Sequence, residues 1–289
     1  MILNASGCLD ALTAPDVAGE LDAFVTKTVT PLPRGGNEPV RIAETDVGML
    51  NSIGLANPGI DEFVEEVLPR LAELDRPIWV SVGGFSAEDY ASLCVILDRR
   101  DEVAAVELNV SCPNVAEPAG SVAEIVKTAR AATSKTLYTK LSPASADIAA
   151  VAEAAVEAGT DGLSLVNTIR GLALDGGTLA PILSTATGGF SGPALRPIAL
   201  AAVFTCYRAT GLPIVAMGGI STGRHALESI AAGASACALG TILFSDPGAP
   251  ARIRSELDVE AQALGFENPL AARAAAHGEK PVLPLRHVA

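Results

Sequence analysis

The sequence predicts an α/β protein folded as a (β/α)₈ TIM barrel, and three observations support this prediction. Eight short apolar or β-branched runs occur along the chain, and most precede a polar or glycine-rich turn and a helical pattern. Alternating strands and helices form a parallel sheet, and eight such units close into a barrel. The length of 289 residues suits one barrel, so residues 1–289 are expected to form a single domain. The expected strands are residues 2–5, 24–28, 78–82, 103–109, 136–141, 162–166, 214–217 and 236–239.

An open, doubly wound sheet is the competing arrangement of alternating strands and helices. Such sheets commonly place a G-x-G-x-x-G motif directly after the first strand. No such motif follows residues 2–5, and no linker or internal repeat divides the chain. The closed barrel is therefore preferred.

Two connections are much longer than the few residues that usually join strands and helices. Residues 29–60 follow the second expected strand, residues 167–192 follow the sixth, and both are rich in Gly and Pro. Long loops inside a compact domain are generally functional. Both insertions are expected at the carboxyl end of the barrel strands, where barrel active sites are built.

Composition narrows the classes of ligand and location. The formal net charge is −13, which disfavours binding to nucleic acid or to an anionic membrane. The five cysteines are scattered without a C-x-x-C pair, so neither a metal site nor an iron–sulfur cluster is expected. No stretch is long and apolar enough to span a bilayer, and residues 1–10 lack the basic region of a signal peptide. A soluble, cytoplasmic protein with reduced thiols is expected.

Polar, small or glycine residues stand at the carboxyl end of every expected strand. Polar groups at these places reduce stability and are hard to explain by packing. Together they predict a ligand site at the mouth of the barrel. The residues concerned are Ser6, Gly7, Lys27, Thr28, Ser81, Asn109, Lys140, Asn167, Thr168, Gly218, Gly219, Gly240 and Thr241.

Glycines follow the last two expected strands. Gly218 and Gly219 precede a helix expected to begin near Ser221, and Gly240 and Thr241 follow the eighth strand. Glycine lets backbone N–H groups approach an anion closely, and barrels often bind phosphate at these two loops. The glycines could instead serve only as tight turns, and the pattern does not identify the phosphate compound.

Lys140 ends an otherwise apolar strand, and Lys27 ends another. An unpaired buried ammonium group is costly, so each charge is expected to face the mouth of the barrel. Lys140 could neutralise an anion, form a Schiff base or belong to a structural ion pair, and Lys27 has the same options. Two lysines together suit a ligand that carries or develops negative charge.

Cys112 is the strongest candidate for chemistry among the cysteines. It lies just past a strand end, in the polar segment Asn109-Val-Ser-Cys-Pro-Asn114. The asparagine amides suit a flat, polar heterocycle, and a thiolate here could act as a nucleophile or as a general base. Cys8 is left unassigned. Three cysteines are interpreted as small buried side chains, namely Cys94, Cys206 and Cys237.

The first long connection contains the segment Asn51-Ser-Ile-Gly-Leu-Ala-Asn57-Pro-Gly59. Its two asparagines could cap a turn. They could equally bind the edge of an amide-bearing ring, and the sequence does not separate these interpretations.

Seven motifs resemble, in order along nearly the whole chain, those of class 1 dihydroorotate dehydrogenases. They are NSIGLANPG, ELNVSCPN, KLSP, VNTIRGLALD, GGFSGPALRPIAL, AMGGIST and ALGT. The cysteine of SCPN resembles class 1, since class 2 enzymes carry serine there. The VNT, ALD and GGFSGPA segments resemble the NAD-linked 1B subtype more than the fumarate-using 1A subtype.

This resemblance implies FMN as cofactor and (S)-dihydroorotate as substrate, oxidised to orotate in de novo pyrimidine biosynthesis. Cys112 would be the catalytic base, and hydride would pass from the neighbouring carbon to the flavin. Lys140 would stabilise the negative charge of the reduced flavin. FMN would be held by Ser6, Lys27, Thr28, Asn109, Lys140, Val166, Gly192, Gly218, Gly219, Gly240 and Thr241. Dihydroorotate would be held by Lys27, Asn51, Ser52, Ile53, Gly54, Leu55, Asn109, Asn167 and Thr168.

Two features depart from the family pattern. The N-terminal stretch that usually precedes the first strand is expected to be absent here, because that strand begins almost at Met1. Either the barrel floor is less covered or the true start of the chain lies upstream. Ser81 stands where relatives often place an asparagine that contacts the flavin, so it is left out of the expected site. The 1B resemblance further implies a homodimer and a separate electron-transfer subunit carrying FAD and an iron–sulfur cluster.

Three other functions fit parts of this pattern. A flavin-dependent oxidoreductase of another dihydropyrimidine, such as dihydrouracil, would share the flavin and the cysteine but need not bind a carboxylate. A Schiff-base lyase or isomerase of a phosphosugar would use Lys140 and no flavin. A noncatalytic barrel would serve as a subunit of an assembly.

Overall fold

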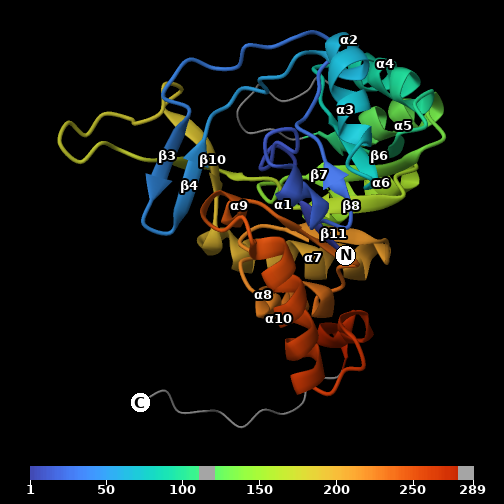
Figure 1. Cartoon of the computed structure of the whole chain (residues 1–289), viewed down its shortest axis with the longest axis vertical. Coiled ribbons are helices and arrows are strands. Elements are labelled where there is room, and N and C mark those ends of the chain that lie inside the picture. Colours follow the sequence, from blue (N-terminus) through green and yellow to red (C-terminus); the bar gives the residue numbers. More distant parts are fainter. Residues whose placement is uncertain (111–120, 279–289) are drawn as a thin grey trace.

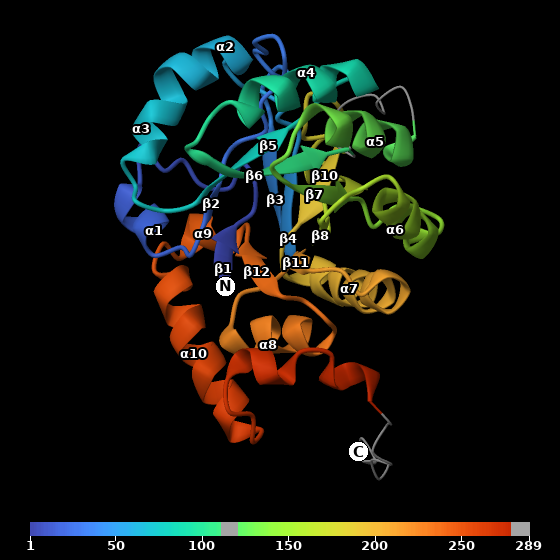
Figure 2. The ribbon, with the colours of Figure 1, turned by 90° about the vertical axis from the view of Figure 1, so that its right-hand side faces the viewer.

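The computed structural model describes residues 1–110 and 121–278. Eight parallel strands form a barrel that helices surround (Figures 1 and 2). Their order around the barrel is β1-β12-β11-β8-β7-β6-β5-β2. The predicted fold class is therefore confirmed, and every strand lies within its expected range. The strands are β1 (Ile2–Asn4), β2 (Phe24–Val25), β5 (Ile78–Val82), β6 (Val103–Asn109), β7 (Thr136–Leu141), β8 (Gly162–Leu165), β11 (Ile214–Met217) and β12 (Ala236–Leu239).

Helices cover the outside of the barrel (Figure 2). The segment that precedes β5 is one helical stretch in which a π-helical turn joins two short α-helices. Within the described ranges, none of the helices is both long and apolar enough to cross a bilayer. The α-helices are α1 (Pro15–Gly19), α2 (Ile60–Glu62), α3 (Leu68–Ala72), α4 (Ala87–Asp98), α5 (Val122–Ala132), α6 (Ile148–Glu157), α7 (Arg196–Thr210), α8 (Gly223–Ala231), α9 (Ile242–Ser245) and α10 (Ala249–Ala263). The π-helical turn is Phe63–Val67, and 3₁₀ turns occur at Pro193–Leu195, Pro269–Ala272 and Ala275–His277.

The barrel closes between β1 and β2, where a side chain supplements the backbone pairing. Leu3 and Ala23 form a single parallel bridge. Next to it, Asn4 Nδ2 donates to the Val25 carbonyl at 2.7 Å, and the Val25 N–H donates to Asn4 Oδ1 at 2.8 Å. Asn4 is fully buried, so its amide takes the place of a strand peptide group in this seam.

The interior of the barrel is a packed core beneath its mouth. Successive strand residues point to opposite sides of the sheet, so one apolar cluster lies inside the barrel and a larger one lies between strands and helices. Trp79 and Tyr138 fill part of the interior, with ring centroids 4.5 Å apart. Gly162 makes room for them, since a Cβ atom there would lie 2.4 Å from the Tyr138 ring. The packed interior leaves the mouth of the barrel above it as a place for a ligand.

The two long connections contain four strands that the sequence did not predict. They pair as an antiparallel sheet in the order β3-β4-β10-β9, here called the small sheet. Its strands are β3 (Ile42–Thr45), β4 (Gly48–Asn51), β9 (Ile169–Leu172) and β10 (Thr187–Ser191). The sheet projects beside the barrel (Figure 1). Its central pairing joins residues 49–51 to residues 189–191, a partnership that local sequence patterns do not reveal.

Replacement of Asn4 by alanine is expected to lower the free energy of unfolding by about 1–3 kcal/mol, because it leaves the buried Val25 N–H and carbonyl groups without these partners. Urea unfolding followed by circular dichroism measures the change. Asn268→Ala is the matched control, because Asn268 is exposed and its bond to the Ala271 N–H can be replaced by water. Equal losses in the two variants would contradict a special role of Asn4 in closing the barrel.

Candidate active site

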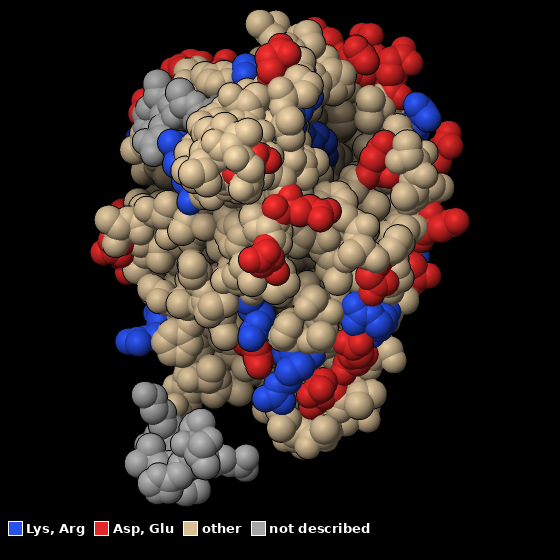
Figure 3. Space-filling model, turned by 90° about the vertical axis from the view of Figure 1, so that its left-hand side faces the viewer, with Lys and Arg blue, Asp and Glu red and all other residues tan. Residues whose placement is uncertain are grey.

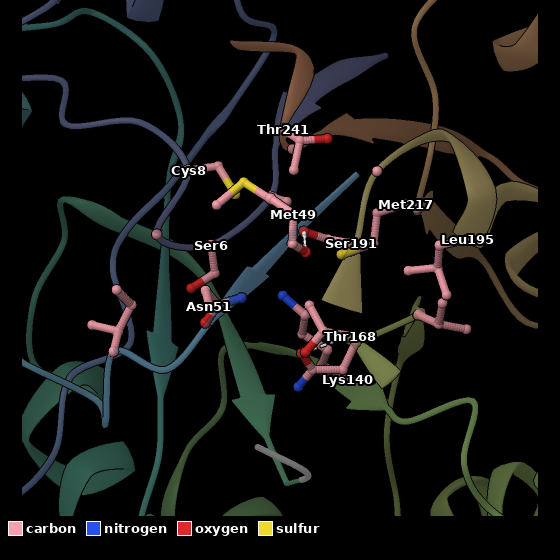
Figure 4. Close-up of a pocket in the computed structure, with 18 of the residues that line it drawn as sticks. Ser6, Cys8, Met49, Asn51, Lys140, Thr168, Ser191, Leu195, Met217 and Thr241 are labelled. Atoms are coloured by element: carbon pink, nitrogen blue, oxygen red, sulfur yellow. Dashed lines mark hydrogen bonds between the residues drawn. The ribbon is translucent and has the colours of Figure 1, made fainter. Parts of the chain in front are cut away.

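A pocket of about 300 Å³ opens at the carboxyl end of the barrel strands. Every barrel strand except β5 contributes residues at or just after its end, and the small sheet supplies another wall (Figure 4). Strand ends in a parallel barrel all lie on one side, which brings together residues that are far apart in the chain. The pocket lies where the polar strand ends predicted a ligand site.

A chain of hydrogen bonds orders the polar side chains on one side of the pocket. Thr28 Oγ1 lies 3.2 Å from Ser6 Oγ and 3.0 Å from Ser81 Oγ. It also accepts a bond from Asn109 Nδ2 at 3.0 Å, and Asn109 Oδ1 accepts one from Asn167 Nδ2 at 3.0 Å. Both ends of the Asn109 amide are engaged, so its orientation is fixed by the protein. Ser81 is buried beneath Thr28 and does not line the pocket.

Lys27 and Lys140 both line the pocket. Lys140 is only 5% exposed, and its Nζ lies 3.5 Å from Glu107 Oε1 inside the barrel. The sequence left three options open for Lys140, and the structure contains one of them, an ion pair with Glu107. The lysine also lines the pocket. Glu107 was missed in the sequence, although a carboxylate within an apolar strand is itself a signal of a paired buried charge.

Cys8 also lines the pocket. Burial raises the pKa of its thiol, and the positive charges of Lys140 and Lys27 oppose this increase. The other cysteines within the described ranges pack in the core, as predicted, and burial raises the pKa of each to about 12. These core residues are Cys94, Cys206 and Cys237.

The glycine turns after β11 and β12 form another part of the wall. Gly218 and Gly219 have φ angles of +120° and +73°, and a Cβ atom at Gly219 would lie 2.9 Å from the Gly192 carbonyl oxygen. A Cβ atom at Gly240 would be in ordinary van der Waals contact, 3.8 Å from Ala5 Cβ and Cys8 Sγ. All three glycines line the pocket, and the lack of a side chain at these positions lets a backbone N–H group approach an anion closely.

The helix after β11 begins later than expected. Thr222, not Ser221, is the N-cap of α8, and its side chain accepts a hydrogen bond from the His225 N–H at 3.2 Å. The pocket wall in this region ends at Ile220. The α8 N-terminus is therefore capped by its own side chain, and the glycine backbone is what borders the pocket.

The two asparagines of residues 51–59 have different roles, and each fits one of the two interpretations that the sequence left open. Asn57 serves the turn: its Oδ1 accepts from the Thr30 and Gly59 N–H groups, and its Nδ2 donates to Thr30 Oγ1. Asn51 lines the pocket from β4, and its Nδ2 donates to the Gly189 carbonyl at 3.2 Å. Asn57 is thus structural, whereas Asn51 is placed to meet a ligand.

Ser52 differs from its neighbours in this segment. Its side chain is fully buried outside the pocket wall, where Ser52 Oγ lies 2.8 Å from Asn37 Nδ2 and 2.6 Å from Thr185 Oγ1. The other expected substrate residues all line the pocket, and so do all the expected cofactor residues. Those not yet placed are Ile53, Gly54, Leu55, Val166, Thr168 and Thr241.

The small sheet and the barrel rim add lining residues that sequence reasoning did not select. Most are apolar side chains whose positions depend on the unpredicted sheet or on barrel closure. They are Ala5, Ile42, Met49, Ser191, Leu195, Met217, Ile220 and Phe244. No group of three or more metal-ligating side chains occurs in the part of the chain that the structure describes.

Cys112 lies outside the described residues, as do its neighbours Ser111, Pro113 and Asn114. The described chain reaches Val110, directly after Asn109 in the pocket wall. The structure therefore does not test the position of the expected base.

Comparisons with known proteins point to one family. The family profile described as "Dihydroorotate dehydrogenase" matches residues 1–260. Two curated relatives are both named "Dihydroorotate dehydrogenase B (NAD(+)), catalytic subunit". The Desulforudis audaxviator protein is 46% identical over 251 residues, which cover 84% of this chain and 81% of the relative. The Listeria monocytogenes protein is 39% identical over 279 residues, with coverages of 92% and 91%.

A solved structure shares the fold. It is the dihydroorotate dehydrogenase of Eimeria tenella in complex with ferulenol, with a TM-score of 0.78 and 24% sequence identity. The match covers 96% of this chain and 85% of the other. The curated relatives and the family profile carry the assignment: the chain belongs to the dihydroorotate dehydrogenase family, which consists of FMN-dependent oxidoreductases.

Proposed function

We propose that this chain oxidises (S)-dihydroorotate to orotate, using FMN, as a step of pyrimidine biosynthesis. One observation supports the proposal above all. In a chain of this family, a single pocket combines two lysines, an ordered row of asparagines and glycine turns. An anionic cofactor and a planar, amide-bearing anionic substrate need these features together.

The residues present fit FMN. The turns at Gly218, Gly219 and Gly240 suit its phosphate group, because their backbone N–H groups can approach it closely. Lys27 and Lys140 suit a ring system that gains negative charge on reduction. The hydroxyl groups of Ser6 and Thr28, the Asn109 amide and the backbone near Val166, Gly192 and Thr241 complete the proposed cofactor site. When bound, FMN supplies a two-electron acceptor for hydride.

The residues present also fit dihydroorotate. Its ring carries amide donors and acceptors that match the side chains of Asn51, Asn109 and Asn167. Lys27 is proposed to face the negative charge of the substrate. Thr168 and the backbone of residues 53–55 complete this side of the site, whereas Ser52 supports the loop from behind. Because hydrogen bonds already orient Asn109, little ordering is required on binding.

Cys112 is proposed as the base that removes a proton from the carbon beside the ring carbonyl. The support comes from the sequence and from the family, since Cys112 follows the pocket residue Asn109 by three positions. The thiolate is the reactive form of a cysteine, and burial in the core disfavours it, as the pKa values of about 12 for Cys94, Cys206 and Cys237 illustrate.

Purified protein is expected to carry FMN, and dihydroorotate is expected to bleach the visible absorbance of the oxidised flavin under anaerobic conditions. Dihydrouracil, which has no carboxylate, should bleach it at least about tenfold more slowly, since a charge-assisted contact contributes about 1.5–3 kcal/mol. Stopped-flow absorbance measures both rates. Faster bleaching by dihydrouracil would assign the chain to another dihydropyrimidine, and colourless protein that cannot be loaded with FMN would contradict the proposal.

Replacement of Cys112 by alanine is expected to leave FMN bound and to slow bleaching by dihydroorotate about 10²–10⁴-fold, the usual contribution of a general base. The wild-type rate should rise with pH as the thiol ionises, around pH 8.5 for an ordinary cysteine, and the variant should lose this dependence. Cys94→Ala is the matched control, because Cys94 packs in the core and should leave the pH profile unchanged. Wild-type rates in Cys112→Ala at neutral pH would remove the cysteine from the mechanism.

The names of the curated relatives also suggest partners. Both are catalytic subunits of NAD-linked enzymes. We propose that this chain likewise passes electrons to a separate subunit carrying FAD and an iron–sulfur cluster. The five scattered cysteines of this chain do not form a cluster motif, so the cluster would belong to that other subunit.

We further propose that the chain forms a homodimer through the small sheet. Both β3 and β9 are edge strands of that sheet, and large uncharged areas lie on the face that carries it (Figure 3). Large apolar side chains on and around the small sheet are 48–72% exposed. A cluster of exposed apolar side chains commonly marks a surface that binds another protein. These side chains are Val40, Ile42, Val47, Leu172, Leu174 and Leu179.

The double variant Val47→Asp/Leu172→Asp is expected to weaken dimerisation at least about tenfold, because buried charges at an apolar interface lack partners. Light scattering coupled to size exclusion measures the mass against concentration. Val259→Asp on α10 is the control, since Val259 is 63% exposed and lies outside the small sheet. A monomeric wild-type protein at micromolar concentration would contradict the proposed dimer.

A further inference from the structure

One buried acid beneath the pocket has no role in the proposed reaction. Glu107 lies on β6 and is 1% exposed. Its neighbours Val106 and Leu108 belong to the cluster between strands and helices, so Glu107 points into the barrel. It stands two residues before Asn109 on the same side of the strand, one layer below the pocket wall.

Lys140 separates this carboxylate from the pocket. Lys140 pairs with Asn109 in the register of β6 and β7, and it lines the pocket, whereas Glu107 does not. The Lys140 Nζ atom lies 3.5 Å from Glu107 Oε1, and the two side chains are 6% and 2% exposed. The ammonium group thus has the carboxylate on its interior side and the pocket on its other side.

Serine side chains lie on the strands that neighbour this ion pair. Ser81 pairs with Glu107 in the register of β5 and β6, and its hydroxyl lies 3.0 Å from Thr28 Oγ1. Ser164 pairs with Lys140 in the register of β7 and β8, and it faces the interior because Leu163 and Leu165 pack outside. Within the described ranges, Glu107 Oε1 and Ser164 Oγ are buried atoms without a hydrogen bond. The charge on Glu107 Oε1 therefore depends on its ion pair with Lys140, and losing that pair would leave an uncompensated buried charge.

We infer that Glu107 is a positioning residue that holds the Lys140 ammonium in the pocket floor and offsets its charge, thereby limiting how strongly the pocket stabilises an electron-rich ligand. The inference rests on the proposed function, because FMN is the ligand that gains negative charge there. A neutral side chain at position 107 would remove this negative charge from beside the ammonium group and make the pocket floor more positive. In a poorly solvated site, that excess positive charge favours the reduced, more negative form of the cofactor.

The test is the midpoint potential of the FMN bound to the Glu107→Gln holoenzyme, measured by anaerobic dye-equilibrated titration at pH 7. The two-electron reduction equilibrium is expected to shift at least tenfold toward the reduced form, which corresponds to a potential about 30 mV more positive. Ser164→Ala is the matched control, because it removes a neutral buried hydroxyl from the same layer. Its potential should equal that of the wild type.

The outcomes separate this inference from the proposed function. Wild-type protein that binds no FMN, or whose FMN dihydroorotate cannot reduce, overturns the proposed function. If the wild type behaves as proposed but Glu107→Gln has an unchanged or more negative potential, Glu107 does not offset Lys140 and only the inference fails. An equal positive shift in Ser164→Ala also overturns it, because a general loosening of the barrel would then explain both.

A second variant covers the case in which Glu107→Gln does not fold with FMN. Glu107→Asp keeps the charge but moves the carboxylate one methylene away from Lys140. It should shift the potential in the same direction by a smaller amount, while the thermal unfolding temperature reports any separate loss of stability. No shift in a folded Glu107→Asp holoenzyme also overturns the inference.

Discussion

Closure of the parallel barrel is the constraint on which the site depends. The strands contain only two to seven residues, so little of the chain is held by sheet pairing alone. The seam between β1 and β2 is completed by the side-chain amide of Asn4. Ser6 follows one of these strands, and Lys27 and Thr28 follow the other. Their contacts with each other and with Asn109 exist only because the seam holds the two strand ends together.

The small sheet is the second element that shapes the pocket. Each long connection forms its own antiparallel strand pair, β3 with β4 and β9 with β10, and the pairing of β4 with β10 joins the two pairs into one sheet. The pairing places Met49 and Asn51 opposite the barrel mouth (Figure 4). It also brings the Gly192 carbonyl against the turn at Gly219, which explains why a larger residue does not fit there. The two long connections therefore form the pocket wall on the side of the small sheet and also contact the glycine turn after β11.

Charge in the pocket is opposite to charge on the whole molecule. The chain carries a formal net charge of −13, whereas the pocket wall contains Lys27 and Lys140. Surface charges are screened by solvent over roughly 10 Å, whereas buried charges are screened much less. Local placement therefore decides which ligand the pocket favours. The Glu107 carboxylate moderates this positive field from below, within the barrel core.

The sequence alone determined the fold class and most of the pocket wall. Strand and helix patterns are local, and a parallel barrel places every strand end on one side, so polar residues at those ends could be predicted to meet. Family motifs added the expected cofactor, substrate and base, of which Cys112 lies outside the described residues. The tertiary structure decided what depends on distant partners: the small sheet, the structural role of Asn57, the burial of Ser52 and the Glu107–Lys140 ion pair. These features arise from pairings between segments far apart in the chain, and no local pattern records which distant group a side chain will meet.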